Sequence, residues 1–252
     1  MKAFNFLLKD TKGKPNTMDL DKGQGYQTTK DMLEITGDYF NLLKYGWGTS
    51  TLYKRDIIKD KNELYHQYDI KTYPGGTLFE IANKQDKIDE YLQEADKLGF
   101  NAIEISDGST YISSKKRQEA ITKVKEQGFY LLTEVGKKDL KKDSELKSED
   151  RVKLIQTDLD NKSDLVIVEA RESGKNIGIF DEKGNIKEDD FETINKNILQ
   201  NKILWEAPQK NQQIDLILKL GADVNLGNIN VNDIISLETL RQGLRGDTLG
   251  KV

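Results

Sequence analysis

Short apolar runs alternate with longer amphipathic stretches along the whole chain. A near-continuous run such as Leu165–Val168 is typical of a strand covered on both faces, whereas apolar residues three and four apart predict helices. The pattern predicts eight strands, at residues 17–21, 41–45, 69–73, 102–106, 130–135, 165–170, 203–207 and 223–226. It predicts eight helices between and after them, at residues 28–37, 50–65, 77–98, 113–127, 148–161, 189–200, 209–220 and 231–244.

Regular alternation of strand and helix favours parallel pairing with right-handed crossovers. Eight strand–helix units over 252 residues average about 31 residues each, the size of one such unit. We therefore expect an α/β fold, a single (β/α)8 TIM barrel that occupies residues 1–252 as one domain. An open doubly wound sheet is the alternative, but residues 21–26 lack the third glycine of its phosphate-binding turn.

Glycines and hydroxyl residues at the element boundaries agree with this assignment. We expect helices to end at Gly99, Gly128 and Gly221, and to begin at the N-caps Thr77, Ser113 and Ser148. The lysine-rich stretch 137–150 is predicted to be a solvated segment.

The residues that are missing exclude several kinds of chemistry. The chain has no cysteine, so disulfides, thiolate nucleophiles and zinc–thiolate sites are impossible. It has one histidine, His66, which excludes a multi-histidine zinc site within one chain and which we expect to be structural. A resident metal would be bound through oxygen, as Mg²⁺ or Mn²⁺ is.

Charge and hydropathy narrow the class of protein. The 39 Lys and Arg residues nearly balance the 43 Asp and Glu residues, so no basic footprint for nucleic acid is expected. No apolar run is long enough to span a membrane, and the run within the first ten residues is too short for a signal peptide. We expect a cytoplasmic protein, and the Lys- and Glu-rich, cysteine-free composition is one seen in thermophiles.

In a (β/α)8 barrel the active site lies where the strands end and the following loops begin. Four successive predicted strands carry a glutamate near that end: Glu104, Glu134, Glu169 and Glu206. The same rim offers the cations Lys22, Lys44, Lys137 and Arg171. Carboxylates beside cations and glycine-rich turns indicate a site for a polyanionic ligand with a divalent metal. Paired Glu and Lys residues that only pack inside the barrel are the alternative.

Spacing adds three expectations about individual residues. Glu169 and Arg171 are two apart and would share a face, where they could form an ion pair that points into the mouth. Lys137 falls on the loop three residues after Glu134, where it is either solvated or leans over a substrate. The loop 225–230 precedes a helix, which is the usual place for a phosphate in this fold.

Several motifs together resemble phosphosulfolactate synthase, a family that makes the first intermediate of one route to coenzyme M in methanogenic archaea. They are Asp-Lys-Gly at 21–23, Lys-Tyr-Gly-Trp-Gly-Thr-Ser at 44–50, Pro-Gly-Gly-Thr at 74–77, Ile-Ser-Asp-Gly at 105–108, Glu-Val-Gly-Lys at 134–137 and Glu-Ala-Arg-Glu-Ser-Gly at 169–174. The resemblance continues to the closing stretch 240–248. It implies a (β/α)8 barrel and the Mg²⁺-dependent addition of sulfite to phosphoenolpyruvate, which gives (2R)-3-phosphosulfolactate.

The resemblance also suggests roles for individual residues. Lys137 would be the general acid that protonates C2 of the substrate, and Glu134, Glu169 and Glu206 would bind Mg²⁺. The remaining expected contacts are Lys22 and Lys44 with the carboxylate or sulfite, Gly227 and Asn228 with the phosphate, helped by Arg171, and Asp21, Ser106 and Asp107 with the substrate.

Three other functions remain open on the sequence alone. A Schiff-base aldolase acting on a phosphorylated substrate would use Lys137 or Lys44 as its amine. The family also includes plant heat-stress-associated proteins, so a member without this activity is conceivable, as is a barrel that only binds an anion. Barrels commonly associate, and we expect a homo-oligomer of unspecified size.

Overall fold

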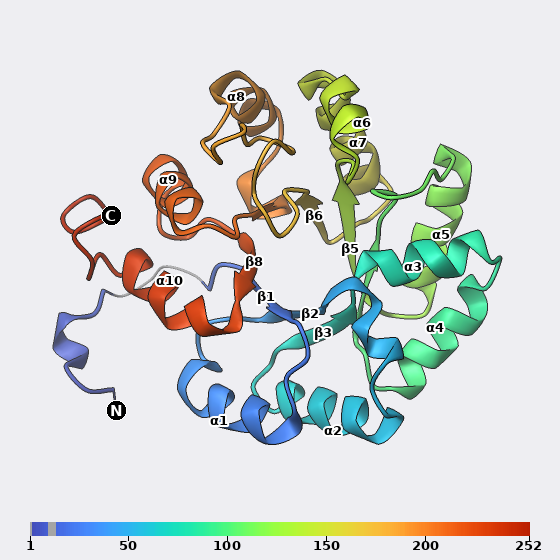
Figure 1. Ribbon diagram of the computed structural model, residues 1–252, viewed down its shortest axis with the longest axis horizontal. Helices are drawn as coiled ribbons and strands as arrows, with labels where there is room; N and C mark the ends of the chain where they lie inside the picture. Colours follow the sequence, from blue (N-terminus) through green and yellow to red (C-terminus); the bar gives the residue numbers. More distant parts are fainter. Residues whose placement is uncertain (1, 10–13) are drawn as a thin grey trace.

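The computed structural model describes residues 2–9 and 14–252, and these residues form one parallel sheet of eight strands. Residues 1 and 10 of the segment considered for a signal peptide lie outside the described residues. The strands are β1 (Thr17–Asp21), β2 (Leu42–Tyr45), β3 (Lys71–Pro74), β4 (Ala102–Ile105), β5 (Tyr130–Val135), β6 (Leu165–Val168), β7 (Ile203–Glu206) and β8 (Leu226–Asn230). Their spatial order is β3-β2-β1-β8-β7-β6-β5-β4, and helices surround them (Figure 1).

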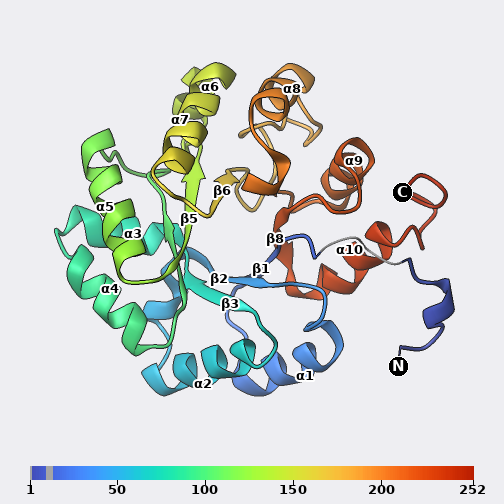
Figure 2. The ribbon, with the colours of Figure 1, turned by 180° about the vertical axis from the view of Figure 1, so that it is seen from behind.

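The sheet closes almost completely into a barrel. β1 pairs with β8, so the first and last strands are neighbours. Between β3 and β4 the Asn101 amide donates to the Thr72 carbonyl at 3.3 Å, and the Thr72 amide donates to Oδ1 of Asn101 at 2.9 Å. The predicted single (β/α)8 TIM barrel is therefore confirmed. The ring of helices is visible from the front (Figure 1) and from behind (Figure 2).

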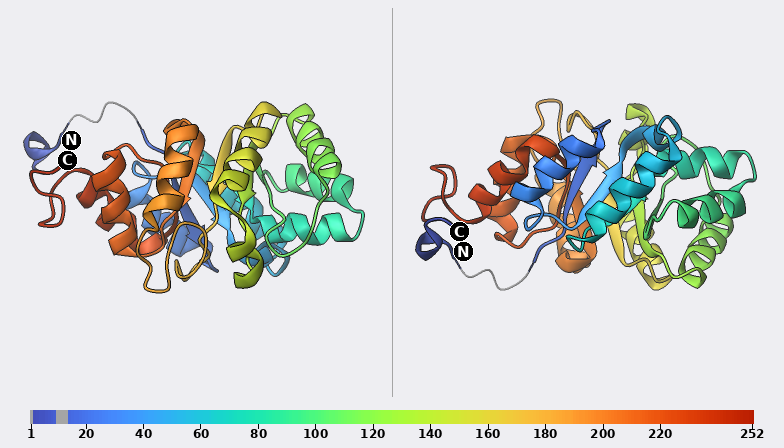
Figure 3. Two further views of the ribbon diagram at one scale, coloured as in Figure 1. Left: turned by 90° about the horizontal axis from the view of Figure 1, so that it is seen from above. Right: turned by 90° about the horizontal axis from the view of Figure 1, so that it is seen from below.

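Helices follow the strands around the outside of the barrel, and both side views show them covering it (Figure 3). They are α1 (Tyr26–Thr36), α2 (Arg55–His66), α3 (Gly76–Lys84), α4 (Ile88–Lys97), α5 (Ser114–Glu126), α6 (Leu140–Glu145), α7 (Ser148–Asp160), α8 (Glu188–Asn197), α9 (Lys210–Leu220) and α10 (Ile234–Arg241). Short 3-10 turns are η1 (Asn5–Leu7), η2 (Gly46–Thr51), η3 (Gln200–Lys202) and η4 (Val231–Asp233). No helix among the described residues is long and apolar enough to cross a membrane.

Four element predictions were wrong. The helix expected at 77–98 is two helices, α3 and α4, because Asp86 between them adopts a left-handed conformation (φ 54°). The helix expected from residue 50 begins at Arg55, after the turn η2. The strand expected at 223–226 runs instead over β8, because the Val224 amide bonds to Gly221 in a turn. The stretch 137–150 is not all solvated, since it contains α6 and the buried side chain of Asp143.

The boundary residues were predicted with mixed success. Gly99, Gly128 and Gly221 all have positive φ after helices, as expected. The Ser113 side chain caps α5 by accepting from the Lys116 amide at 3.3 Å. Thr77 and Ser148 do not cap their helices, because Gly75 and Lys147 occupy the N-cap positions.

Apolar side chains form two layers on either side of the barrel wall. The inner layer fills the barrel and consists of Met18, Leu42, Tyr73, Ala102, Leu132, Leu165, Ile167 and Leu204. The larger outer layer lies between strands and helices and takes the alternate residues of the same strands, such as Leu43, Ile103 and Val166. Successive side chains of a strand point to opposite faces of the sheet. The residues of the inner layer therefore show which positions near the strand ends point into the barrel.

A buried polar group lies in the outer layer, where β1 meets α1 and α2. Lys61 of α2 forms a fully buried ion pair with Asp21 and also donates to the Gln24 carbonyl at 2.7 Å. Asp19 is fully buried beside them, and neither of its carboxylate oxygens has a well-formed hydrogen bond among the described residues. Burial, reinforced by the charge of Asp21, raises the pKa of the Asp19 carboxyl well above its usual range.

We predict that Asp19→Asn stabilises the protein, and increasingly so as the pH rises. In the unfolded chain Asp19 loses its proton near about pH 4, whereas the folded protein holds that proton to higher pH. Wild-type stability therefore declines above about pH 4 through this group, and the amide lacks that loss. At about pH 8 we expect a gain of about 1–3 kcal/mol in the free energy of unfolding, measured by urea denaturation.

Asp21→Asn is the matched comparison. It removes the charged partner of a buried lysine, so we expect it to destabilise the protein at every pH tested. If wild type and Asp19→Asn were equally stable from about pH 4 to about pH 8, the pKa of the Asp19 carboxyl would not be raised in the folded protein, and the prediction would be wrong.

Candidate active site

The alternation of side chains along the strands places charged residues directly above the inner apolar layer. On β5 Leu132 is in that layer and Glu134 comes two residues later, and on β7 the same relation holds for Leu204 and Glu206. Glu104 on β4 and Lys44 on β2 follow the same rule, and Glu169 comes immediately after β6. All five side chains are at least nine-tenths buried. The carboxyl ends of the strands thus carry a buried charged ring.

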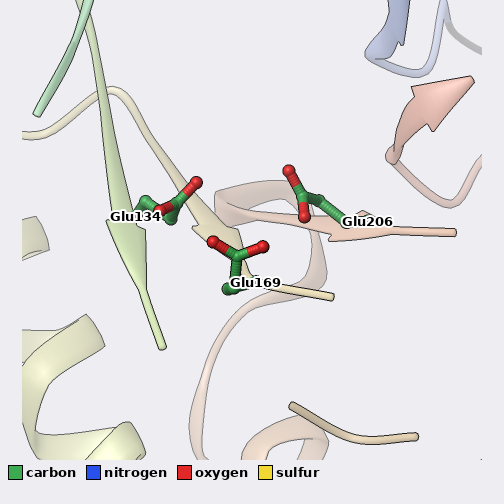
Figure 4. Close-up of side chains that lie close together, drawn as sticks. All are labelled: Glu134, Glu169 and Glu206. Atoms are coloured by element: carbon green, nitrogen blue, oxygen red, sulfur yellow. The ribbon is translucent and has the colours of Figure 1, made fainter. Parts of the chain in front are cut away.

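Three glutamates of this ring face one another. Glu134, Glu169 and Glu206 each offer a carboxylate oxygen within 4.8 Å of the others, and they come from three successive strand ends (Figure 4). These are the three residues that the sequence analysis assigned to a metal, and the fold brings them together.

Lys44 holds part of this carboxylate group together. Its ammonium lies 3.0 Å from Glu104 and 3.5 Å from both Glu134 and Glu206. Burial lowers the pKa of Lys44, but the surrounding carboxylates outweigh burial and hold that pKa well above its usual value. Lys44 is therefore a permanent buried cation.

Lys138 provides a second cation, which shares Glu134 with Lys44. Its ammonium lies 3.8 Å from Glu80, 3.6 Å from Glu134 and 3.8 Å from Glu169. It also donates to the Thr77 hydroxyl at 3.3 Å. Burial lowers the pKa of Lys138, and the charges of Glu134 and Glu169 raise it further than burial lowers it, so the ammonium stays protonated.

The glutamates differ in their affinity for a proton because their neighbours differ. Burial raises the pKa of Glu104 to about 7, against the opposing effect of Lys44. Burial also raises the pKa of Glu169, and the charges of Glu134 and Glu206 add to that effect. At Glu134 the charges of Lys138 and Lys44 outweigh burial, so its pKa lies below the usual range. The ring can thus hold both charged and protonated carboxyl groups at neutral pH.

A cavity of about 470 Å³ opens above this ring. It is lined by Leu20, Lys44, Gly46, Trp47, Gly75, Gly76, Thr77, Glu134, Lys138, Glu169, Arg171, Glu172, Ser173, Glu206 and Asn228. Trp47, Arg171 and Asn228 all have left-handed backbones, with φ of 50°, 58° and 55°. Non-glycine residues in that region are strained, and such strain concentrates at functional sites.

Of the other residues that the sequence analysis singled out, Arg171 and Asn228 line the cavity. Arg171 does not form the expected ion pair with Glu169. Its backbone amide donates to Glu169 at 2.6 Å, while its guanidinium donates to the Lys138 carbonyl at 3.2 Å. The Asn228 side chain donates to the Arg171 carbonyl at 3.3 Å. Lys22 lies at the mouth, where it pairs with Glu172.

Lys137 does not line the cavity. Its ammonium donates to the Asp107 carboxylate at 2.6 Å and to the Asp107 carbonyl at 3.0 Å. Its backbone amide donates to Asp143 at 2.9 Å, and Asp143 also accepts from Gly178 at 2.8 Å. The structure therefore pairs Lys137 with Asp107 beside the cavity and directs the next lysine, Lys138, into it.

Three further residues with an expected substrate contact are buried away from the cavity. Asp21 faces the outer layer and accepts from the Gly23 and Gln24 amides at 2.7 and 2.9 Å. Ser106 donates to Glu134 at 2.6 Å, so it supports a cavity residue. Gly227 points into the barrel, where an added Cβ would lie 2.5 Å from Leu204.

Sequence reasoning missed Lys138, Glu80 and Glu172. Lys138 was hidden in a lysine-rich stretch, although its spacing of four residues from Glu134 was visible. Glu80 lies on α3, and its carboxylate accepts hydrogen bonds from the Ser109 amide at 2.9 Å and the Thr110 hydroxyl at 2.8 Å. Only the packing of α3 against the strand ends could have placed it at the site.

The fold and this cavity define a class: a (β/α)8-barrel enzyme with a buried ring of carboxylates and lysines at the carboxyl ends of its strands. A sequence model of the family (2R)-phospho-3-sulfolactate synthase (ComA) matches residues 9–247. The chain therefore belongs to the phosphosulfolactate synthase family of enzymes.

Individual relatives agree with this membership. The chain is 53% identical to the phosphosulfolactate synthase of Methanocaldococcus jannaschii over 252 residues, which is all of both chains. It is 50% identical to that of Methanothermobacter thermautotrophicus, over all of this chain and 99% of the relative. The Bacillus subtilis phosphosulfolactate synthase is 38% identical, over 91% of this chain and 90% of the relative.

Solved structures support the fold alone. The Salmonella typhimurium 3-hexulose-6-phosphate synthase superimposes with a TM-score of 0.56 at 14% identity and covers 94% of each chain. A fungal endo-β-N-acetylglucosaminidase of glycosyl hydrolase family 18 gives a TM-score of 0.58 at 9% identity, over 86% of this chain and 90% of that one.

We predict that Gly76→Ala disrupts the carboxylate ring. The Gly76 amide donates to Glu104 at 2.9 Å, and an added Cβ would lie 2.4 Å from Oε1 of Glu104 and 2.5 Å from Cβ of Ser106. Both neighbours are fully buried, so neither can move aside without disturbing the packing around it. We therefore expect the free energy of unfolding, measured by urea denaturation, to fall by about 1–3 kcal/mol. Gly246→Ala, where nothing lies within 4 Å of the added Cβ, should change stability by less than about 0.5 kcal/mol. Equal effects of the two substitutions would contradict the close packing at Gly76.

Proposed function

We propose that the protein catalyses the addition of sulfite to phosphoenolpyruvate, with Mg²⁺ as cofactor, giving (2R)-phospho-3-sulfolactate, in which the sulfo group is on C3 and the phosphate remains on the C2 oxygen. The observation that carries the proposal is the buried group of Glu134, Glu169 and Glu206 beside two lysines, in a chain of the phosphosulfolactate synthase family. The product would be the first intermediate of the coenzyme M route implied by the resemblance in sequence.

The donor set suits a small, hard divalent cation. Carboxylate oxygens are the ligands that Mg²⁺ prefers in proteins. Oε2 of Glu134 and Oε2 of Glu169 are buried without a hydrogen-bond donor among the described residues, and ion pairs of 3.5 and 3.8 Å are their closest links to Lys44 and Lys138. These oxygens are free to face a metal ion. Glu134, Glu169 and Glu206 are therefore the proposed ligands.

Charge balance supports the same assignment. Five buried glutamates surround two lysines: Glu80, Glu104, Glu134, Glu169 and Glu206 around Lys44 and Lys138. Even with Glu169 protonated, as its raised pKa implies, the carboxylates outnumber the ammonium groups. Phosphoenolpyruvate and sulfite are both anions, so a cavity with an excess of carboxylates would repel them. A divalent cation would offset that excess and let the lysines and Arg171 bind the substrates.

The proposed reaction needs no side-chain nucleophile, because sulfite itself attacks C3. The electron pair of the double bond moves through C2 into the carboxylate, and bound Mg²⁺ would supply positive charge to stabilise it there. C2 must then take up a proton from one side. Lys44 and Arg171 would bind the substrate anions, and Asn228 would orient Arg171.

We assign the proton donor to Lys138 and not to Lys137. The resemblance in sequence favoured Lys137, but its ammonium is engaged by Asp107, whereas the ammonium of Lys138 faces the cavity. Glu134 and Glu169 raise the pKa of Lys138 and keep it protonated, and a divalent cation on those carboxylates would weaken that effect and make the ammonium a stronger acid. The Schiff-base alternative is less well supported, because it needs a neutral amine and the pKa of Lys44 is raised.

The first test follows the enol absorbance of phosphoenolpyruvate in the presence of the purified protein, sulfite and Mg²⁺. We expect loss of absorbance that requires sulfite, stops with EDTA and returns when Mg²⁺ is added in excess. Loss without sulfite would indicate another reaction. No loss from a folded protein at elevated temperature would contradict the proposed function.

The second test compares Lys138→Met with Lys137→Met. Removal of a general acid costs about 10²–10⁴-fold in rate, so we expect such a loss of kcat for Lys138→Met. Phosphoenolpyruvate binding, measured by calorimetry without sulfite, should remain detectable. Lys137→Met should retain a larger share of the activity, because its ammonium pairs with Asp107. If Lys137→Met proved the more damaging substitution, the assignment to Lys138 would be wrong.

A further inference from the structure

An ion pair crosses the mouth of the active-site cavity. Lys22 follows β1 and Glu172 lies on the loop after β6, and their side chains form a salt bridge. The Lys22 ammonium also lies 5.4 Å from the centre of the Trp47 ring. Trp47 and Glu172 both line the cavity, so this pair is part of its entrance.

This pair differs from the buried pairs below it. The side chains of Lys22 and Glu172 are 32% and 52% exposed, whereas those of Lys44 and Glu104 are 10% and 0% exposed. Exposed ion pairs contribute only about 0–1 kcal/mol, so this one is readily exchanged. Among the described residues, the Glu172 carboxylate has no hydrogen bond or salt bridge to any group other than Lys22.

The backbones behind the two side chains are fixed. Asp21 accepts hydrogen bonds from the Gly23 and Gln24 amides, which holds the loop that carries Lys22. The Arg171 amide, one residue before Glu172, is bound to Glu169 at 2.6 Å. Opening the pair therefore requires only that two long side chains reorient, without movement of either loop.

We propose that Lys22 and Glu172 form an exchangeable pair that captures a doubly charged anionic group such as a phosphate: that group of the ligand takes the place of Glu172 on Lys22. A dianion attracts the ammonium about twice as strongly as a single carboxylate at the same distance. Displaced from Lys22, the exposed Glu172 side chain turns to water. In the empty enzyme Glu172 neutralises Lys22 and so competes with the ligand. The identity of that ligand as phosphoenolpyruvate rests on the proposed function.

The test measures binding without turnover. Phosphoenolpyruvate is titrated in the presence of Mg²⁺ and the absence of sulfite, by calorimetry and by Trp47 fluorescence. Trp47 is a useful reporter because it is 50% exposed and beside Lys22, while the other tryptophan, Trp205, is 1% exposed. Titration of Trp47→Phe identifies the part of the signal that belongs to Trp47.

Four variants decide the proposal. Glu172→Gln should bind phosphoenolpyruvate about five-fold tighter than wild type, since the competing charge is gone. Lys22→Met should bind about ten-fold or more weakly. The double variant should match Lys22→Met, because without Lys22 there is no exchange. Glu182→Gln removes the same charge from an exposed position on the same loop and should bind like wild type.

Unchanged or weaker binding by Glu172→Gln would overturn the proposal. So would a gain that persists in the Lys22→Met background, because it would reflect general repulsion without exchange. Inorganic phosphate serves as a second probe. If phosphate shows the expected pattern and phosphoenolpyruvate does not bind, the exchange stands and the proposed substrate is wrong. If neither probe binds the folded wild type, the exchange is wrong as well.

Discussion

The structure of the site depends on one buried cation, the ammonium of Lys44, and on the carboxylates around it. Burying a charge without a partner is very costly, and Lys44 is nine-tenths buried, so the 3.0 Å contact with Glu104 and the longer ones with Glu134 and Glu206 are obligatory. Their positions are fixed in turn by the Gly76 amide and the Ser106 hydroxyl, which bind Glu104 and Glu134. The ring is therefore a single electrostatic unit, and the loss of Lys44 would leave Glu104 and Glu206 without a salt-bridge partner among the described residues.

A second set of buried carboxylates anchors the loops from outside the cavity. Asp21 binds the loop after β1 and is held by Lys61. Asp143 binds the Lys137 and Gly178 amides and is held by Arg151 at 2.8 Å, so it ties the loop after β5 to the loop after β6. These contacts hold the backbones of the loops that carry Lys22, Lys138 and Arg171 to the mouth of the cavity.

Much of the fold could be predicted, because apolar runs and periodicity report burial directly. Seven of the eight predicted strands coincide closely with the observed ones, and the barrel follows from their number and alternation. The errors occur where a local backbone conformation overrides the pattern. The left-handed conformation of Asp86 ends one helix and separates it from the next, although the hydropathy pattern predicts a single helix. The turn formed by Gly221 and Val224 makes β8 begin at Leu226, later than predicted. Neither backbone conformation changes the spacing of the apolar residues, so the hydropathy pattern could not reveal either one.

The sequence by itself determined which strands carry carboxylates at their ends, because side-chain direction alternates along a strand and the active end of a barrel is known in advance. It could not show which of two adjacent and chemically identical residues, Lys137 or Lys138, places its ammonium in the cavity. Only the tertiary structure made that choice: the turn after β5, with Gly136 at φ 145°, gives one ammonium to Asp107 and the other to Glu134 and Glu169. Glu80 and Glu172 became part of the site for the same reason, since their positions depend on how a helix and a loop pack over the strand ends.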